Sequence, residues 1–392
     1  MSRIKPLNLL CLLMALQTPS AALAEDAGPI VDTTPSMDVL SDAEWARLDG
    51  SVARALTWLA GKQQRDGSFP TLAHRQPGVT SLALLAFAAH GHLPGTGPYG
   101  EQLSRAVDYV LSCQKPSGIL ALAAPAGTTL SRNTPHELGV AASYNHAIGS
   151  LSLSELYTIQ GAERAKKLQS VIEQSLEMSL TMQNWPKQRE IDRGGWRYVN
   201  RFQNIDSDLS LTGWELMFLR SAKNAGFDVS QEPIDEAVAY IRRCFTPRYS
   251  TFNYTAVQDD QRSRGVSGAG VLALAHAGYH NSEEALKTGD WILQHNFDRY
   301  NQIETFTQTG HYKDRYHYSV FNCCQAMYQL GGRHWELFFP RTATTLMNNQ
   351  QNDGSWPRES NDNEREYGDC YTTALVVLAL GAPNQLLPIF QR

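Results

Sequence analysis

Three aspartates stand just before apolar runs, where a side-chain carboxyl group could act as an acid. Asp206 and Asp208 open the stretch DSDLSL, and Asp369 precedes a run that ends LVVLAL. Asp208 and Asp369 are therefore candidate catalytic residues, because a carboxyl group at such a place can serve as a general acid or base. The same positions suit helix capping, since a carboxylate accepts hydrogen bonds from the first N–H groups of a helix. Both interpretations of Asp208 are open at this point.

Histidine, tyrosine and cysteine side chains gather near the starts of other apolar segments. Helix caps need neither histidine nor tyrosine, so the set indicates the lining of a binding site. Taken singly, His146 and His317 are better explained as core histidines with satisfied hydrogen bonds. The candidate cavity-binding residues are Asp206, His136, Tyr144, His146, Tyr316, His317, Cys370 and Tyr371.

The helices that would position these residues alternate between two kinds, with a period near fifty residues that is typical of helical-hairpin arrays. The stretch 41–44, SDAE, is a capping box, and TSLALLAFAA is apolar on every side. Amphipathic helices are predicted near 42–63, 100–114, 163–183, 232–244, 281–295 and 334–350. Apolar helices are predicted near 78–90, 137–158, 208–224, 264–277, 316–330 and 369–380.

A similar loop follows each amphipathic helix, best preserved as QRDGSF at 64–69 and QNDGSW at 351–356. We expect the glutamine to bond backbone groups at the helix end, the glycine to turn the chain and the aromatic ring to pack on the next helix. Asp66 and Asp353 are then turn residues rather than catalytic acids. The residues predicted to mark the end of each amphipathic helix, a glutamine or in one repeat a cysteine, are Gln64, Gln114, Gln183, Cys244, Gln294 and Gln351.

Six such hairpins can close into a ring or stack into an open solenoid. A solenoid needs polar capping repeats at its ends, whereas here the last repeat carries the same marker as the first. The sequence therefore predicts an all-α fold, an α6/α6 toroid with apolar helices inside and amphipathic helices outside, over residues 41–392. An open all-helical solenoid is the alternative.

The two loop sequences resemble the QW motif of the prenyltransferase and squalene-cyclase repeat family. Further stretches resemble an exported bacterial subgroup of that family, so the resemblance covers residues 45–392. They are GGWRY at 194–198, DSDLSLT at 206–212, AKNAG at 222–226, QAMYQLGG at 325–332 and LPIFQR at 387–392. The resemblance implies an apolar central cavity, and six helix N-termini at one face would favour an anion at its mouth.

Neither known catalytic site of the family is complete in this chain. Squalene–hopene-type cyclases protonate an alkene with the DxDD motif, of which Asp369 matches only the first residue, while 206–208 lacks the last. Protein prenyltransferases hold zinc with D-x-C-Y and a histidine. Cys370 and the tyrosine after it match, but Gly368 replaces the aspartate and no histidine follows His334. We expect neither a metal nor a cofactor.

Three functions fit these features, and whether the chain is an enzyme stays open. The first is binding or transformation of an apolar, isoprenoid-like molecule or lipid in the cavity. The second is a non-catalytic binding or scaffold module of the cell envelope. The third is a carbohydrate-active enzyme, which would need Asp208 and Asp369 to face each other across a cleft.

The N-terminus reads as a secretory signal. Arg3 and Lys5 precede the apolar run 7–16, and the small residues at 22–24 form a cleavage site. We predict a signal peptide over 1–24, export to the periplasm or the medium, a disordered lead-in over 25–40 and no transmembrane segment in the mature chain. An uncleaved anchor is the alternative, although the run is short for a bilayer.

The net charge bears on nucleic-acid binding, and the cysteine content bears on disulfide bonds. The net charge is −5 with no long basic run, so nucleic acid is not an expected partner. Nothing in the sequence indicates an oligomeric state. Five cysteines follow the signal, an odd number, and export permits disulfides. A bond from Cys370 to Cys323 or Cys324 is the pairing to test, because these residues would start or line adjacent inner helices.

Overall fold

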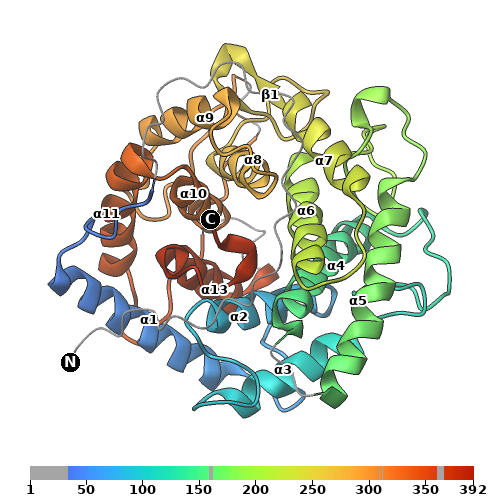
Figure 1. Ribbon diagram of the computed structural model, residues 1–392, viewed down its shortest axis with the longest axis horizontal. Helices are drawn as coiled ribbons and strands as arrows, with labels where there is room; N and C mark the ends of the chain where they lie inside the picture. The colour runs from blue at the N-terminus through green and yellow to red at the C-terminus, as the bar shows by residue number, and fades with distance from the viewer. Residues whose placement is uncertain (1–33, 159–161, 309, 311, 360–365) are drawn as a thin grey trace, which may run out of the picture. The chain divides into compact units, whose positions relative to one another are not determined.

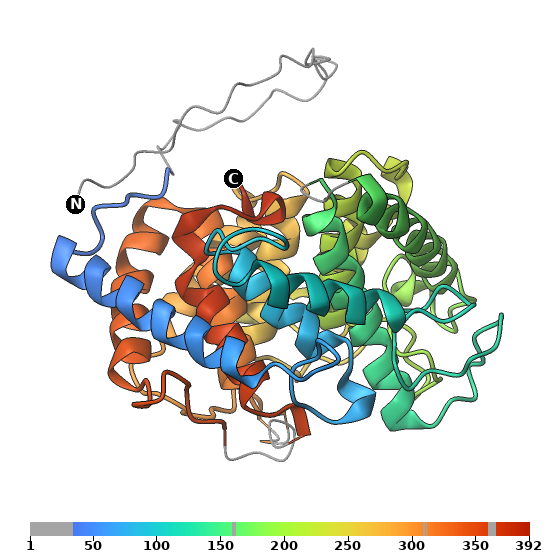
Figure 2. The same cartoon turned by 90° about the horizontal axis from the view of Figure 1, so that it is seen from below.

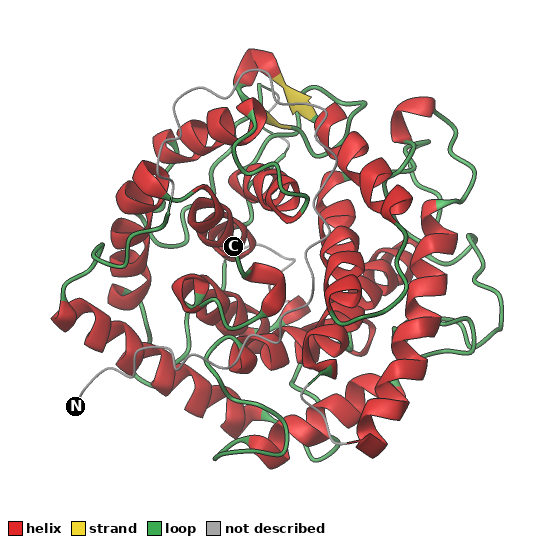
Figure 3. Ribbon diagram, viewed as in Figure 1, coloured by secondary structure: helices red, strands yellow, loops and turns green. Residues whose placement is uncertain are grey.

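The computed structural model describes residues 34–158, 162–308, 310, 312–359 and 366–392. The predicted signal peptide and residues 25–33 of the lead-in lie outside them. Helices and loops make up nearly all of the described chain (Figure 3). Its one sheet is a hairpin in which β1 (Phe245–Thr246) pairs antiparallel with β2 (Thr251–Phe252). The predicted all-α class is confirmed, and no described helix combines the length and apolarity needed to cross a bilayer.

Two sets of helices alternate along the chain. The first set is α1 (Asp42–Lys62), α3 (Gly100–Ser112), α5 (Ala162–Gln183), α7 (Gln231–Arg243), α9 (Glu283–Gln294) and α11 (Gly332–Asn348). The second set is α2 (Gly78–Ala88), α4 (His136–Tyr157), α6 (Leu209–Asn224), α8 (Arg264–His276), α10 (Tyr316–Leu330) and α13 (Asp369–Leu380). Short 3-10 turns occur at Ala73–Arg75, Glu190–Asp192, Pro247–Tyr249, Ala382–Asn384 and Pro388–Phe390.

The second set closes into an inner ring. Each of its helices contacts the next in the order α2, α4, α6, α8, α10, α13, and α13 contacts α2 again (Figure 1). The first set lies outside it, with α11 between α9 and α1. This closure confirms the toroid and excludes the open solenoid.

Burial explains which helices lie inside. Every residue of α2 is buried, as an apolar surface on all sides requires. In α1, by contrast, the buried residues lie on one face at three- and four-residue spacing, and the rest are solvated. The predicted capping box starts α1, with Glu44 N donating to Ser41 Oγ and Ser41 N donating to Glu44 Oε2.

A glutamine at the end of four outer helices binds the next outer helix. Gln63 Nε2 donates to Gln102 O of α3 at 2.8 Å and to Gly67 O of its own loop at 3.0 Å. Gln350 Nε2 bonds Ser51 O of α1 and Gly354 O, each at 2.8 Å, and so joins the last outer helix to the first. Gln114 and Gln183 make the same bonds to Val171 O and Pro233 O.

In the first and last loops, the glutamine predicted to bond backbone groups at the helix end was therefore wrong by one residue. Gln64 and Gln351 accept hydrogen bonds from serine hydroxyls within their own loops instead. Cys244 and Gln294 make no such bond to a neighbouring outer helix among the described residues.

The loop glycine allows two outer helices to approach closely. Gly354 has φ +99°, and a Cβ there would lie 2.6 Å from Arg54 O in α1, closer than real contacts allow. Only glycine combines this φ with this contact. Asp353 Oδ1 accepts the Ser355 amide at 3.0 Å, so the aspartate shapes the turn as predicted.

Both ends of the described chain pack on the rings. Ser36 O accepts a hydrogen bond from Trp335 Nε1 at 2.9 Å, and Leu40 is buried, so residues 34–40 of the predicted lead-in are held against α11. The C-terminal segment returns to the centre of the inner ring and lies at one end of it (Figures 1 and 2).

Candidate functional site

A cavity of about 590 Å³ lies within the inner ring, near the N-terminal ends of its helices. That volume is in the range of sites for small organic molecules. All six inner helices contribute side chains to its wall. They are Leu82 from α2, Val140, Tyr144 and Ile148 from α4, Ser210 and Trp214 from α6, Val266 from α8, Tyr318 from α10, and Tyr371 and Leu375 from α13.

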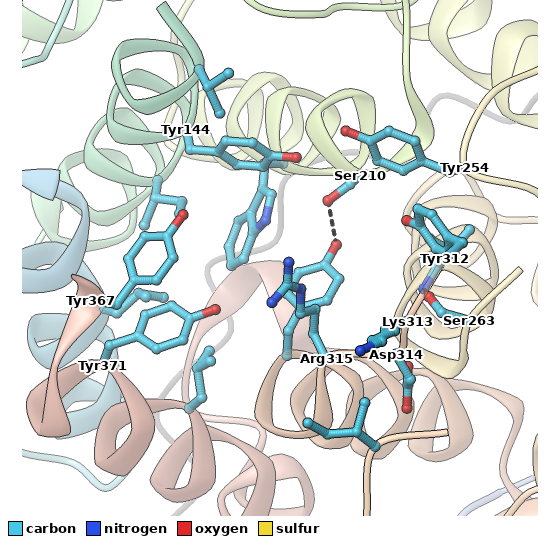
Figure 4. Close-up of a pocket in the computed structure, with 18 of the residues that line it drawn as sticks. Tyr144, Ser210, Tyr254, Ser263, Tyr312, Lys313, Asp314, Arg315, Tyr367 and Tyr371 are labelled. Atoms are coloured by element: carbon cyan, nitrogen blue, oxygen red, sulfur yellow. Dashed lines mark hydrogen bonds between the residues drawn. The ribbon is translucent and has the colours of Figure 1, made fainter. Parts of the chain in front are cut away.

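Tyrosines dominate the described lining. Figure 4 shows Tyr144, Tyr367 and Tyr371 on one side of the cavity, with Tyr254 and Tyr312 on the other. The rings of Tyr367 and Tyr371 are stacked, with centroids 4.6 Å apart. Burial, reinforced by Asp208, raises the pKa of Tyr254 well above its usual value, so it remains a neutral hydrogen-bonding phenol.

Two hydroxyl pairs lie on this wall. Ser210 Oγ and Tyr318 Oη are 2.7 Å apart, as the dashed line in Figure 4 marks. Tyr198 Oη and Tyr254 Oη are also 2.7 Å apart. Together with Ser263 and the charged side chains of Lys313, Asp314 and Arg315, these pairs are the polar part of a wall that is mostly aromatic and aliphatic, as a site that orients a ligand requires.

Asp208 lies fully buried directly behind these tyrosines rather than on the cavity wall. Its Oδ1 accepts the Leu211 amide at 2.8 Å, which makes it the N-cap of α6. Burial raises its pKa to about 6, against the opposing effects of Arg197, the Leu211 amide and the Tyr254 hydroxyl. The residue is thus both a helix cap and a carboxylic acid that holds its proton more tightly than an exposed aspartate does.

Arg197 completes this buried group. Its Nη1 lies 3.6 Å from Asp208 Oδ2, and its guanidinium lies over the rings of Tyr198 and Tyr254, at 4.7 and 5.6 Å from their centroids. Burial disfavours its charge, but Asp208 and the phenols outweigh this and raise its pKa. Arg197 was not predicted as a site residue, although it lies in the stretch GGWRY at 194–198.

The other two predicted acids lie away from the cavity wall. Asp369 is exposed at the start of α13 and forms an ion pair with Arg358 Nε at 2.7 Å. Asp206 is buried, but its Oδ1 bonds Arg132 Nη2 at 3.0 Å and its Oδ2 accepts the Gln188 amide at 2.8 Å, so it ties loops together. The facing pair of Asp208 and Asp369 that a carbohydrate-active enzyme would need is therefore absent from the described cavity lining.

The two central histidines are core residues. His146 Nδ1 accepts the Leu120 amide at 3.1 Å, and its Nε2 is 3.1 Å from Ser179 Oγ, which in turn donates to Glu215 Oε2. Burial lowers the pKa of His146 to about 3, so the ring is neutral. His317 is likewise buried, with Nε2 2.9 Å from Tyr300 Oη.

Of the predicted cavity-binding residues, only Tyr144 and Tyr371 reach the described wall. His136 is exposed and stacks on Phe202, with centroids 4.1 Å apart. Tyr316 is buried against other aromatic rings. Tyr198, Tyr254 and Tyr312 are lining residues that were missed, because they lie in loops without helical periodicity.

None of the described cysteines forms a disulfide or belongs to a cluster of potential metal ligands. Cys113, Cys244, Cys323, Cys324 and Cys370 are all buried free thiols, so the suggested disulfide from Cys370 is not formed. Burial raises the pKa of Cys370 to about 12 and keeps it protonated. Within the described ranges, no three histidine, cysteine or acidic side chains cluster as metal ligands would.

No family model matches the chain, and no curated protein does. Among solved structures, the type II terpene cyclase MstE from Scytonema with geranylgeranyl dihydroxybenzoate is 12% identical, with a TM-score of 0.55 over 89% of this chain and 100% of that chain. Its complex with merosterolic acid A is 13% identical, with a TM-score of 0.54 over the same shares. A glycosidase bound to glucose is 11% identical, with a TM-score of 0.55, again over 89% and 100%. The chain therefore has the all-α toroid fold that a terpene cyclase and a glycosidase share.

Proposed function

We propose that this protein binds an apolar, isoprenoid-like molecule in the cavity of its inner ring and transfers a proton to it. The observation that carries the proposal is the lining itself, in which tyrosine rings, Trp214 and aliphatic side chains make up most of the wall and Lys313, Asp314 and Arg315 form its charged part. Such a wall favours a largely apolar ligand, because its burial removes apolar surface from water on both partners. The terpene cyclase of the same fold, whose complex contains a geranylgeranyl substrate, is consistent with this ligand class.

The described lining does not favour glycoside hydrolysis. That chemistry needs two carboxyl groups on either side of the scissile bond. Asp314 is the one acid among the described lining residues, and its Oδ2 is held by Arg264 Nε at 2.6 Å. A single carboxyl group on the described wall does not supply the pair that this chemistry needs.

Asp208 is the proposed proton source. Its carboxyl group gives its proton to Tyr254 Oη as Tyr254 passes its own proton to Tyr198 Oη, 2.7 Å away, and Tyr198 in turn protonates the ligand. Asp208 is left as a carboxylate that Arg197 and the Leu211 amide stabilise. The positive charge formed on the ligand faces electron-rich aromatic rings, which attract cations. The cation then loses a proton from an adjacent carbon to water in the cavity, and water returns a proton to Asp208 through Tyr198 and Tyr254.

The binding step is tested with geranylgeraniol as the probe and native mass spectrometry as the measurement. The wild type should bind one molecule. Ile148→Trp puts an indole into the cavity and should weaken binding on the order of tenfold or more, whereas Leu337→Trp, on the exposed face of α11, should not. Equal binding by the wild type and a folded Ile148→Trp variant would refute the proposal.

The proton step is tested with Asp208→Asn in deuterated water. Asparagine caps helices as well as aspartate does but leaves the buried Arg197 charge unpaired, so the melting temperature should fall by several degrees while the protein stays folded. The wild type should place deuterium on a carbon of the bound isoprenoid, and Asp208→Asn should reduce this on the order of a hundredfold, as loss of a general acid does. Asp369→Asn, outside the lining, is the matched control. Undiminished deuterium uptake in Asp208→Asn would sink the acid role.

A further inference from the structure

Three aromatic rings in contact with one another close the bottom of the cavity. The Trp214 indole forms the floor and lies nearly parallel to the Phe321 ring, with centroids 5.6 Å apart and an interplanar angle of 11°. Phe321 in turn meets the edge of Phe390, with centroids 6.0 Å apart and an interplanar angle of 77°. The floor is therefore supported from below by the C-terminal segment.

That C-terminal segment is held in place by inner-ring side chains. Gln329 Nε2 donates to Phe390 O at 2.6 Å, and the Ile389 amide donates to Glu155 Oε2 at 3.2 Å. Leu387, Ile389 and Phe390 are each only 3% exposed. Residues 387–390 thus fill the end of the inner ring that lies opposite the cavity mouth.

Behind Trp214 lies a void that is too small to hold a water molecule. A narrow gap there is lined by Trp214 together with Gly213, Met217, Ala269, Leu272 and Ala273. Ser210, Trp214 and Tyr318 line both this gap and the cavity. Small residues on α6 and α8 leave this space, and the indole separates it from the cavity.

We propose that Trp214, backed by Phe321 and the C-terminal Phe390, sets the length of the apolar chain that the cavity accepts. This inference rests on the proposed function and adds the determinant of ligand length to it. An apolar ligand chain that enters from the mouth must end at the indole, because Phe321 and the C-terminal segment fill the space beyond it. Removing the indole joins the gap to the cavity and makes room for about one more five-carbon unit.

The test is competition among geraniol, farnesol, geranylgeraniol and geranylfarnesol, followed by native mass spectrometry. In Trp214→Ala the best-bound alcohol should be one unit longer than in the wild type. The ratio of the two affinities should change on the order of tenfold or more, because several additional carbons are buried. Trp214→Leu, which removes less of the buried ring, should shift the preference in the same direction and guards against a variant that does not fold.

Two further variants make the result specific. Ala269→Phe added to Trp214→Ala refills the gap from α8 and should restore the wild-type preference. Trp291→Ala removes an indole from the outer helix α9 and should leave the preference unchanged. An unchanged preference in the folded Trp214 variants, or a shift that Ala269→Phe does not reverse, overturns the inference alone. If the wild type binds none of the four alcohols, the proposed function fails and the inference fails with it.

Discussion

Gln350→Ala should weaken the contact between α11 and α1 that closes the outer ring. Gln350 Nε2 donates to Ser51 O and Gly354 O at 2.8 Å each, and its Oε1 accepts from Ser51 Oγ at 2.8 Å. These bonds connect the end of α11 to α1, segments about three hundred residues apart in sequence. Alanine removes these three bonds and the exposed one that Arg54 Nη2 donates to Gln350 Oε1, and it leaves the buried Ser51 without its partner.

The size of the effect follows from the bonds lost. Each is worth about 1 kcal/mol net, and an orphaned buried group adds to the cost, so the free energy of unfolding should fall by about 3 kcal/mol. For a domain of this size the entropy of unfolding near the melting temperature is roughly 0.7 kcal/mol/K. The melting temperature should therefore drop by about 4 °C.

Urea unfolding followed by circular dichroism measures this change, with Gln294→Ala as the matched control. Gln294 ends α9 at the corresponding place in its repeat, but makes no bond to the next outer helix among the described residues. Its replacement should cost well under 1 kcal/mol, as a surface change does. If Gln350→Ala and Gln294→Ala lower the free energy of unfolding equally, the hydrogen bonds of Gln350 do not hold the ring closed.

Further measurements test the loop, the core and the thiols. Gly354→Ala should cost about 2 kcal/mol more than Gly226→Ala in urea unfolding, because both have φ above +90° but only Gly354 faces a backbone oxygen within 3 Å; equal costs would refute the close approach. Burial raises the pKa of Glu215 to about 8, so the unfolded chain loses this proton first; the free energy of unfolding should fall as pH rises from about 4.5 to 8. Glu215→Gln should flatten that part of the curve, and an unchanged slope would contradict the assignment. The five described cysteines should react with a thiol reagent only after unfolding, and rapid reaction in the native protein would argue against their burial.

Helix positions and their inner or outer place were predictable because they depend on local patterns. The apolar helix predicted at 316–330 matches α10 residue for residue, and the all-round apolar run in α2 marked a helix buried on every side. Closure of the ring also followed, since neither end of the repeat array carried a polar cap.

Which of two adjacent glutamines bonds the neighbouring outer helix was not predictable from the loop sequence. QRDGSF and QNDGSW each follow another glutamine, and only the packed structure shows that Gln63 and Gln350 reach the neighbouring helix. Two adjacent glutamines point in different directions at a helix end, so a one-residue shift changes which of them meets the partner.

By itself, the sequence determined a closed double ring of helices with an apolar interior, because hydrophobic periodicity is a property of neighbouring residues. Only the tertiary structure decided which side chains face the cavity. Tyr198 and Tyr254 come from loops far apart in sequence, and Asp208 lies behind them while Asp369 faces solvent, although both aspartates start inner helices. Such a site depends on the direction in which each helix presents its first turn and on the path of the loops, and no repeat pattern encodes either.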